Sequence, residues 1–273
     1  MSNLPGEILD YIVDFLHDSQ TELRNCCLVS KSWVPRTRRH LFADVRFDPT
    51  GTWLQSWKKM FPDASISPAH YTTDLTIACP EVLTDADEEV GGWIGGFSRV
   101  IHLSVVGLSL LNGHPVTLAA LQGVSPVMKT LLMGSINIQS SQLFDLILSF
   151  PLLENLNIFN CNDVPTDKND SPGGIPPAVQ PPPMTGSLNL SQGGGMGSIA
   201  RWLLSLPGGA HFRRLNLECR REGDLSLVIA LVEECSRTLE SLEIASGFFG
   251  TSIWHLRPRR RPIFSSRGEL CFN

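Results

Sequence analysis

The stretch LLENLNIFNC, residues 152–161, decides the fold of this chain. From Leu153 it follows the pattern L-x-x-L-x-L-x-x-C, in which Leu156 and Ile158 alternate with polar Asn155 and Asn157. Alternation with a period of two predicts a short strand that buries one face and leaves the other open. One such strand cannot bury its apolar side alone, so the pattern requires similar neighbours along the chain.

Six further segments repeat this pattern: DLTIAC (74–79), IHLSVV (101–106), TLLMGS (130–135), SLNLSQ (187–192), RLNLEC (214–219) and SLEIAS (241–246). The equivalent leucines are Leu75, Leu103, Leu131, Leu156, Leu188, Leu215 and Leu242, separated by 28, 28, 25, 32, 27 and 27 residues. Amphipathic segments at 140–150, 197–206 and 224–236 predict helices between the strands. A strand–helix unit with a period in the high twenties is typical of leucine-rich repeats.

The resemblance to leucine-rich repeats implies an α/β solenoid over residues 71–250, interrupted by a proline-rich insertion at 163–187. In that family Cys161 would bond exposed backbone at the turn, and an ordinary buried thiol is a compatible interpretation. Targets of such repeats usually lie on the concave strand face. The candidate target-binding residues are Thr76, Ser104, Asn157, Asn189, Asn216 and Glu243, although each position also suits a solvated polar face.

The N-terminal residues predict three short helices. Pro5 suits a first helical turn, and Ile8, Leu9, Ile12, Phe15 and Leu16 form a broad apolar face behind it. Ser19 and Glu22 form a capping box, so a second helix should begin near Gln20. A third helix should begin near Ser32 and place Pro35 in its first turn. About 40 residues are close to the lower limit for independent folding, so this unit either packs on the rest of the chain or docks on a partner.

The residues of this N-terminal unit follow a particular order, which is Leu4-Pro5-x-Glu7-Ile8-Leu9, Ile12, Leu16, Leu23, Cys26, Leu28-Val29-Ser30-Lys31-x-Trp33 and Leu41-Phe42. This order resembles the F-box. In that family the helices dock on a Skp-type adaptor, which connects the protein to a cullin–RING ubiquitin ligase. The resemblance implies that the adaptor-binding residues are Leu4, Pro5, Ile8, Leu28, Val29 and Trp33. Leu9, Ile12 and Leu16 would instead hold the helices together.

The chain is therefore expected to comprise an F-box (1–45), a connector (46–70), the repeat solenoid (71–250) and an irregular basic tail (251–273). The combination resembles substrate receptors of SCF-type E3 ubiquitin ligases, which are not enzymes and need no cofactor. We expect a Skp-type adaptor, cullin bound through it and an unidentified protein substrate as partners, in the cytoplasm, the nucleus or both. A scaffold that binds the adaptor without ligase function is an alternative.

Composition is consistent with this class. The 273 residues carry a net charge of −5, which argues against a nucleic-acid-binding protein, and no apolar run is long enough to cross a membrane. Seven cysteines without C-x-x-C spacing indicate reduced thiols rather than disulfides or a zinc site. RPRRR (257–261) is a solvated tail or, alternatively, a nuclear-import signal or a contact for an acidic surface.

One motif suggests a different function. Gly195–Ala200 fits G-x-G-x-x-A after a predicted strand, and Glu218 follows 23 residues later, as in dinucleotide-binding βαβ units. We interpret the motif as a glycine turn within one repeat, because the βα period continues on both sides of it.

Overall fold

The structure is a computed structural model that describes residues 5–47, 56–57, 59–63, 66–78, 94–107, 115–163, 181–191, 196–219, 222–246, 252–256, 262–264 and 270–272. These residues form an α/β fold around one nine-stranded sheet, in the order β1-β2-β3-β4-β6-β8-β9-β10-β11. All pairs from β1 to β10 are parallel and follow chain order, whereas β11 is antiparallel to β10. Each strand therefore lies beside the strand of the unit before it.

The sheet strands are β1 (Asp44–Phe47), β2 (Asp74–Ala78), β3 (His102–Val106), β4 (Thr130–Gly134), β6 (Asn155–Phe159), β8 (Ser187–Ser191), β9 (Arg214–Cys219), β10 (Ser241–Ser246) and β11 (Ser252–Leu256). Two short pairs lie outside it: β5 (Asn137–Ile138) with β7 (Asn162–Asp163), and β12 (Pro262–Phe264) with β13 (Leu270–Phe272). The helices are α1 (Gly6–Phe15), α2 (Gln20–Val29), α3 (Val34–Leu41), α6 (Pro115–Gln122), α7 (Ser140–Leu148), α8 (Met196–Leu204) and α9 (Glu222–Cys235), with a 3-10 helix η2 (Pro68–Tyr71).

The seven predicted strands all form, and their leucines are in register. Each leucine is the direct cross-strand partner of the next along the sheet, in the order Leu75, Leu103, Leu131, Leu156, Leu188, Leu215 and Leu242. Each is at most 2% exposed. Parallel strands about 4.8 Å apart place identical side chains in contact, so the row forms a continuous apolar core that no single unit could build.

The backbone repeats as regularly as the leucines do. At the start of the strands, one carbonyl of the preceding unit accepts two consecutive N–H groups. Ala43 O accepts from Thr73 and Asp74, each at 2.9 Å. The same arrangement recurs with the carbonyls of Thr73, Ile101, Lys129, Gly186 and Arg213. These bonds satisfy the turn backbone where it enters the sheet, which buried polar groups require.

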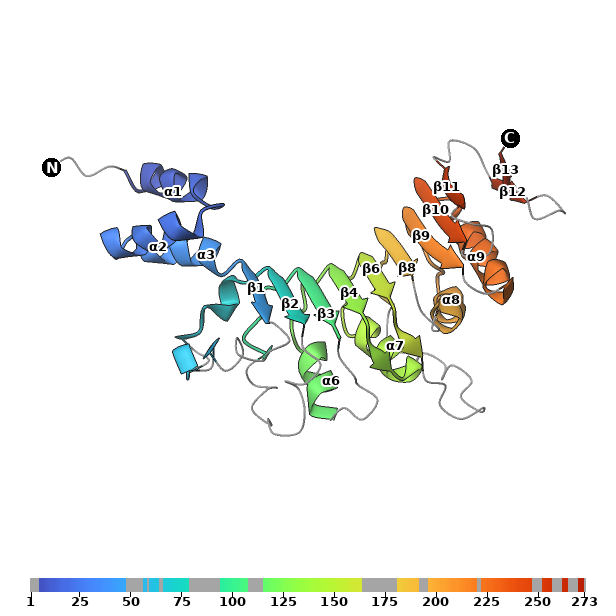
Figure 1. Cartoon of the computed structure of the whole chain (residues 1–273), viewed down its shortest axis with the longest axis horizontal. Helices are drawn as coiled ribbons and strands as arrows, with labels where there is room; N and C mark the ends of the chain where they lie inside the picture. The colour runs from blue at the N-terminus through green and yellow to red at the C-terminus, as the bar shows by residue number, and fades with distance from the viewer. Residues whose placement is uncertain are drawn as a thin grey trace.

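The sheet curves, and its strands lie along the inner side of the arc while α6, α7, α8 and α9 lie along the outer side (Figure 1). The three helices predicted between the strands form as α7, α8 and α9. Phe144 of α7 stacks on Trp202 of α8, with ring centroids 4.6 Å apart. The leucines face these helices, so the alternate residues of each strand face the open, concave side.

The 32-residue spacing between Leu156 and Leu188 does not interrupt the sheet. Asn155 Oδ1 accepts hydrogen bonds from Ser187 N and Ser187 Oγ, both at 2.9 Å. Asn155 Nδ2 donates to Thr130 Oγ1 at 3.3 Å. One side chain thus joins β4, β6 and β8 beside the proline-rich insertion, most of which lies outside the described residues.

Two of the expected domain boundaries do not coincide with the ends of structural elements. The division at residue 45 falls inside β1, which pairs in parallel with β2 because Val45 and Phe47 alternate inward and join the core. The C-terminal segment is not irregular throughout, since β11 pairs with β10 and β12 pairs with β13. The basic stretch 257–261 lies outside the described residues.

The connector anchors the N-terminal end of the sheet with an aromatic cluster that sequence reasoning did not find. Trp57 contacts Phe42, Phe47, Phe61 and Phe97, with ring centroids 5.0–6.0 Å apart. Trp57 and Phe97 are almost fully buried. The cluster joins the end of α3, β1 and the segment before β3 into one core.

The N-terminal helices stand at one end of the arc, where α1 and α2 project away from the sheet (Figure 1). α3 packs against α1, α2 and η2 and so connects the helices to the sheet. Among the described residues no helix is long and apolar enough to cross a membrane.

Neighbouring leucines on β4 test the core. Leu131 belongs to the buried row, whereas Leu132 lies half-buried on the concave side. We expect Leu131→Ala to lower the free energy of unfolding by about 3 kcal/mol, because it leaves a cavity between β3 and β6. Leu132→Ala is the matched control and should cost less than about 1 kcal/mol. If chemical denaturation shows that both variants lose the same free energy of unfolding, the assignment of Leu131 to the buried face and Leu132 to the concave face is contradicted.

Candidate functional site

One face of α1 is apolar and exposed. Ile8, Tyr11, Ile12 and Phe15 are spaced three and four residues apart, so they lie on one side of the helix. Their side chains are 49, 73, 37 and 78% exposed. With Leu28 (86%) and Val29 (67%) of α2, they make up six of the eleven large apolar side chains that the described residues leave exposed. Exposed apolar surface is therefore concentrated on the N-terminal helices, as in surfaces that bind another protein.

The helices are held together by few side chains. Val13, Leu23, Cys26 and Thr37 are buried. Thr37 Oγ1 donates to Trp33 O at 2.7 Å, which satisfies its hydroxyl. Val13 occupies the buried position beside Ile12, which is 37% exposed, while Leu9 and Leu16 are half-buried.

The predicted adaptor-binding residues lie mostly on exposed surface. Pro5 is the exposed N-cap of α1, Ile8, Leu28 and Val29 are exposed, and Trp33 is the half-buried N-cap of α3. Leu4 lies outside the described residues. The second helix begins at Gln20 as predicted, but the Ser19 side chain makes no capping hydrogen bond. Sequence reasoning missed Tyr11 and Phe15 of the exposed α1 face as candidates, although the same helical spacing that selects Ile8 could have found them.

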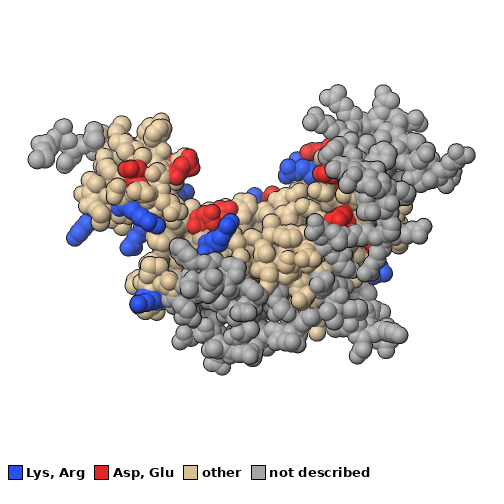
Figure 2. All heavy atoms as spheres, viewed as in Figure 1, with Lys and Arg blue, Asp and Glu red and all other residues tan. Residues whose placement is uncertain are grey.

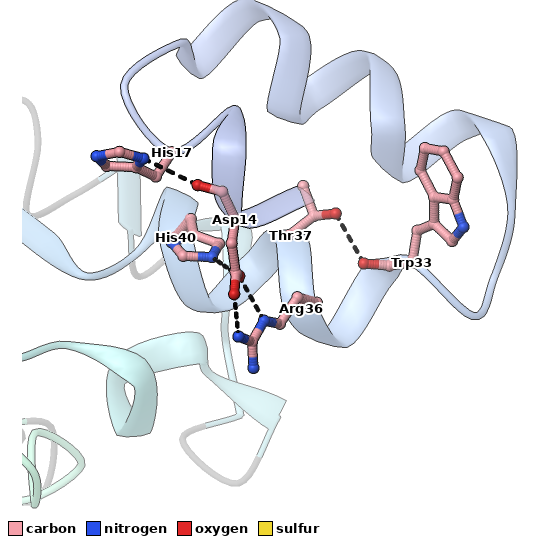
Figure 3. A network of polar contacts seen from close by, with 6 residues as sticks. All are labelled: Asp14, His17, Trp33, Arg36, Thr37 and His40. Carbon is pink, nitrogen blue, oxygen red and sulfur yellow. Dashed lines mark hydrogen bonds and ion pairs between the residues drawn. The ribbon is translucent and has the colours of Figure 1, made fainter. Parts of the chain in front are cut away.

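A polar network fixes α1 on α3 (Figure 3). The Asp14 carboxylate accepts hydrogen bonds from Arg36 Nε at 2.6 Å and from Arg36 Nη2. It also contacts His40 Nε2 at 2.7 Å, and His17 Nδ1 lies 2.9 Å from the Asp14 carbonyl oxygen. A carboxylate held by both arms of a guanidinium has a defined orientation. The network therefore sets the angle at which the apolar face of α1 is presented.

Electrostatics reinforce this link. Hydrogen bonds from Arg36 and His40 hold the pKa of Asp14 well below its usual range, and the Asp14 carboxylate raises the pKa of Arg36. Asp14 is ionised throughout the physiological range and keeps the pair formed.

The second surface is the concave face of the sheet. The six predicted target-binding residues occupy the same register position on their strands, so the structure brings them into one row: Thr76, Ser104, Asn157, Asn189, Asn216 and Glu243. Leu132 of β4 completes this middle row between Ser104 and Asn157. We did not predict Leu132, because a pattern that selects polar residues between leucines passes over an apolar one.

An aromatic ring covers part of this face. Phe159 lies two residues beyond Asn157 on β6 and pairs with Gly134 of β4. A Cβ at Gly134 would overlap the Phe159 ring, so the ring occupies the space that any other residue at 134 would fill. Phe159 is only half-buried and offers apolar surface to the concave side.

The thiols are poor candidates for chemistry. The described cysteines Cys26, Cys27, Cys161, Cys219 and Cys235 are all free. Burial raises the pKa of Cys161, Cys219 and Cys235 to about 11, so these thiols stay protonated at neutral pH. Cys161 Sγ lies 3.6 Å from Phe159 O and 3.9 Å from Met133 O, which fits a buried thiol that also bonds turn backbone. No cluster of metal-binding side chains occurs in the described parts of the chain.

The glycine motif lies partly outside the described residues, since α8 begins at Met196. Met196 and Ala200 are buried, and a Cβ at Gly197 would lie 3.6 Å from Leu227 of α9. The first turn of α8 is thus packed against the neighbouring helix.

Figure 2 shows small acidic and basic groups on the face drawn, without an extended basic field over its described residues. Comparison of the chain with protein-family models finds no match, and comparison with curated proteins finds none either.

The Asp14 network makes a testable prediction. In the folded chain the pKa of Asp14 lies below its ordinary value of 3.8. The contribution of Asp14 to the stability of the fold is therefore present above about pH 5 and is lost as the pH falls through and below 3.8. Because Asp14 is partly exposed, we expect Asp14→Asn to cost only about 1 kcal/mol at pH 7. Hydrogen exchange of α1 amides should accelerate in this variant.

Glu7→Gln is the control, because Glu7 is an exposed carboxylate in the first turn of the same helix, away from Asp14. Equal exchange rates in both variants at pH 7 would show that the network does not hold α1.

Proposed function

We propose that this chain is a non-catalytic substrate-receptor subunit of an SCF-type cullin–RING E3 ubiquitin ligase. In this proposal α1, α2 and α3 are an F-box that binds a Skp-type adaptor, and the βα units are leucine-rich repeats that hold a target protein. The observation that carries the proposal is the concentration of exposed apolar side chains on α1 and α2, which project from the sheet.

The energetics of that face support a partner. Fully burying one large apolar side chain contributes about 1.5–3 kcal/mol. Ile8, Tyr11, Phe15, Leu28 and Val29 leave most of this contribution unused in the isolated chain. A protein that covers them would gain it, less the cost of association. The position of Ile8, Leu28 and Val29 on this surface agrees with the family pattern that suggested the adaptor.

The sheet supports the second half of the proposal. Its units repeat with a period of 25–32 residues, its leucines stack in register, and its helices lie on the outer side. The residues between the leucines remain on an open concave face, where a target would be in reach.

The mechanism is proximity. Chemistry in such a ligase belongs to other subunits, and the receptor holds a lysine-bearing target close to a ubiquitin carrier, which raises the effective concentration of the reacting groups. We accordingly propose no catalytic residue and no cofactor for this chain, and we place it in the cytoplasm, the nucleus or both.

Binding of purified chain to an immobilised Skp-type adaptor tests the proposal. Leu28→Asp and Val29→Asp each put a charge into the proposed interface, where its desolvation is unfavourable. Since both side chains are exposed in the free chain, the fold should be unaffected, and we expect at least a roughly tenfold loss of affinity.

Leu225→Asp is the matched control, because Leu225 is an exposed leucine (41%) on α9, far along the chain from the helices. It should bind like the original chain. Unchanged adaptor binding by Leu28→Asp and Val29→Asp would refute the docking surface. Purification of the tagged chain from cells that recovers the adaptor without cullin or ubiquitinated protein would instead favour a scaffold without ligase function.

A further inference from the structure

The centre of the concave face carries no charge. β4, β6 and β8 each present three alternate residues to this side. None of these residues is ionisable: they are Thr130, Leu132, Gly134, Asn155, Asn157, Phe159, Ser187, Asn189 and Ser191. On the flanking strands acidic and basic residues both occur, with Asp74 and His102 towards the start of the sheet and Arg214, Glu218 and Glu243 towards its end. A charged group of a partner would therefore be desolvated over β4, β6 and β8 without meeting a counter-ion on those strands.

Apolar surface lies at one side of this uncharged centre. The Phe159 ring extends from β6 across Gly134 of β4. Leu132 lies two residues before Gly134 on the same strand, and Val106 of β3 is the cross-strand partner of Gly134. The side chains of Val106, Leu132 and Phe159 are half-buried. Together they form an apolar surface, called the Phe159 surface below, on which one large side chain of a partner can pack.

Asparagines continue the centre beyond this surface. Asn157, Asn189 and Asn216 are consecutive cross-strand partners on β6, β8 and β9 and form the asparagine row. All three are half-buried, and none of their side chains makes a hydrogen bond with the part of the chain that the structure describes. Asn189 Oδ1 is itself buried and has no donor among the described residues. Buried polar atoms are normally hydrogen-bonded, so a row of unused amides indicates a role outside the fold.

Asn155 shows what a structural asparagine does in this sheet. It lies on β6, two residues before Asn157, and its amide bonds residues of both neighbouring strands, β4 and β8. Asn160, just after β6, likewise donates to Ser135 Oγ at 3.1 Å. The asparagine row makes no such links within the described residues, so joining strands does not account for it. Each of its primary amides offers both a donor and an acceptor, which are the two groups that bind a peptide main chain.

We propose that the concave face binds an uncharged, extended segment of the target protein, which lies across β4, β6, β8 and β9. One large apolar side chain of the segment packs on the Phe159 surface, and the asparagine row forms hydrogen bonds with its main chain. A main-chain N–H group over β8 supplies the donor that Asn189 Oδ1 lacks. This inference rests on the proposed function, because it names the kind of segment that the receptor would recognise.

The spacing of the strands sets the length of the recognised segment. From Asn157 to Asn216 there are two steps of about 4.8 Å, or about 10 Å in total. An extended chain advances about 3.3 Å per residue, so about three residues cover the asparagine row. The large apolar residue precedes or follows these residues. Lys, Arg, Asp or Glu over β6 or β8 would be desolvated without a counter-ion, so uncharged residues are expected there.

Selection from a phage-displayed random library tests the nature of the segment. Peptides of roughly 12 residues, extended at about 3.3 Å per residue, are long enough to span the face. Against the immobilised full chain we expect enrichment of peptides in which a large apolar residue has uncharged residues beside it. Enrichment of peptides charged at those positions, or of none, would overturn the proposal. Self-association of the chain that Leu132→Ala weakens in analytical ultracentrifugation would also overturn it, because a second copy would then occupy the face.

Asn189 and Asn155 provide a matched pair of variants. Asn189→Val removes an amide that makes no hydrogen bond within the described chain, so the midpoint of chemical denaturation should not fall. An enriched peptide should nevertheless bind at least about tenfold more weakly. Asn155→Val should instead lower the midpoint, because its amide joins β4, β6 and β8. Unchanged peptide affinity in Asn189→Val would overturn the proposal.

A charge introduced into the asparagine row tests its selectivity. Asn189→Asp keeps the size of the side chain but adds a carboxylate, so an enriched peptide should bind at least about tenfold more weakly. Selection repeated on this variant should enrich Lys or Arg in place of an uncharged residue, which a merely structural effect would not produce. Leu225→Asp adds the same charge on the outer helix α9 and should change neither the affinity nor the selected sequences.

The apolar contact is tested at Leu132. Leu132→Ala shortens a side chain of the Phe159 surface and should weaken an enriched peptide at least about tenfold. Leu225→Ala is the matched control, because Leu225 is an exposed leucine of α9 and should leave the affinity unchanged. Equal affinity of the peptide for both variants would overturn the assignment of the apolar residue to this surface.

Adaptor binding separates this inference from the proposed function. The variants at Leu132, Asn189 and Leu225 should bind the Skp-type adaptor normally. Failure of the peptide selection with normal adaptor binding overturns only the concave-face proposal, whereas failure of the original chain to bind the adaptor overturns the proposed function whatever the peptides do.

Discussion

In-register burial of one leucine per unit is the constraint on which the rest of the structure depends. Leu131 or Leu156 cannot be removed from water by its own strand and helix, so each unit is stable only between neighbours. The two ends of the row must then be closed by something else. At the beginning, β1 and the Trp57 cluster cover the first unit. At the other end β11 runs antiparallel to β10, which ends the parallel series.

The periodicity of the sequence predicted most of this architecture, because each strand repeats the same alternation and each leucine follows the last by a nearly constant interval. What it missed has physical reasons. β1 has four residues and directly follows the third helix, so its alternation is too short to stand out. α6 carries apolar residues without a clear one-sided pattern. On α1, adjacent Ile12 and Val13 both fit an apolar face, and only the packing of α2 and α3 decides that Val13 is buried. The contact of Phe159 with Gly134 depends on strand register, which a single strand does not reveal.

The two candidate surfaces differ in physical character. The surface on α1 and α2 is apolar and carried by helices with a small core of their own, so it gains most by being covered. The concave face is half-buried and mixed in polarity, which suits selective recognition more than simple burial. They lie on different elements, and α3 joins them through η2 and the Asp14 network. If the proposed function holds, the rigidity of that junction determines how a bound target is oriented toward the rest of the ligase.

The side chain of Asn155 has a practical consequence. It joins β6 to β8 through Ser187 on the far side of the proline-rich insertion, so the sheet closes with bonds made entirely outside residues 164–180. Register at this point is set by Asn155 and Ser187 and not by the length of chain between them. Closing a longer loop adds little entropy cost, since each doubling costs only about 0.6 kcal/mol. A fluorescent reporter or an epitope tag inserted into that interval should therefore leave the sheet intact, and it would be separated in sequence from the residues of both candidate surfaces.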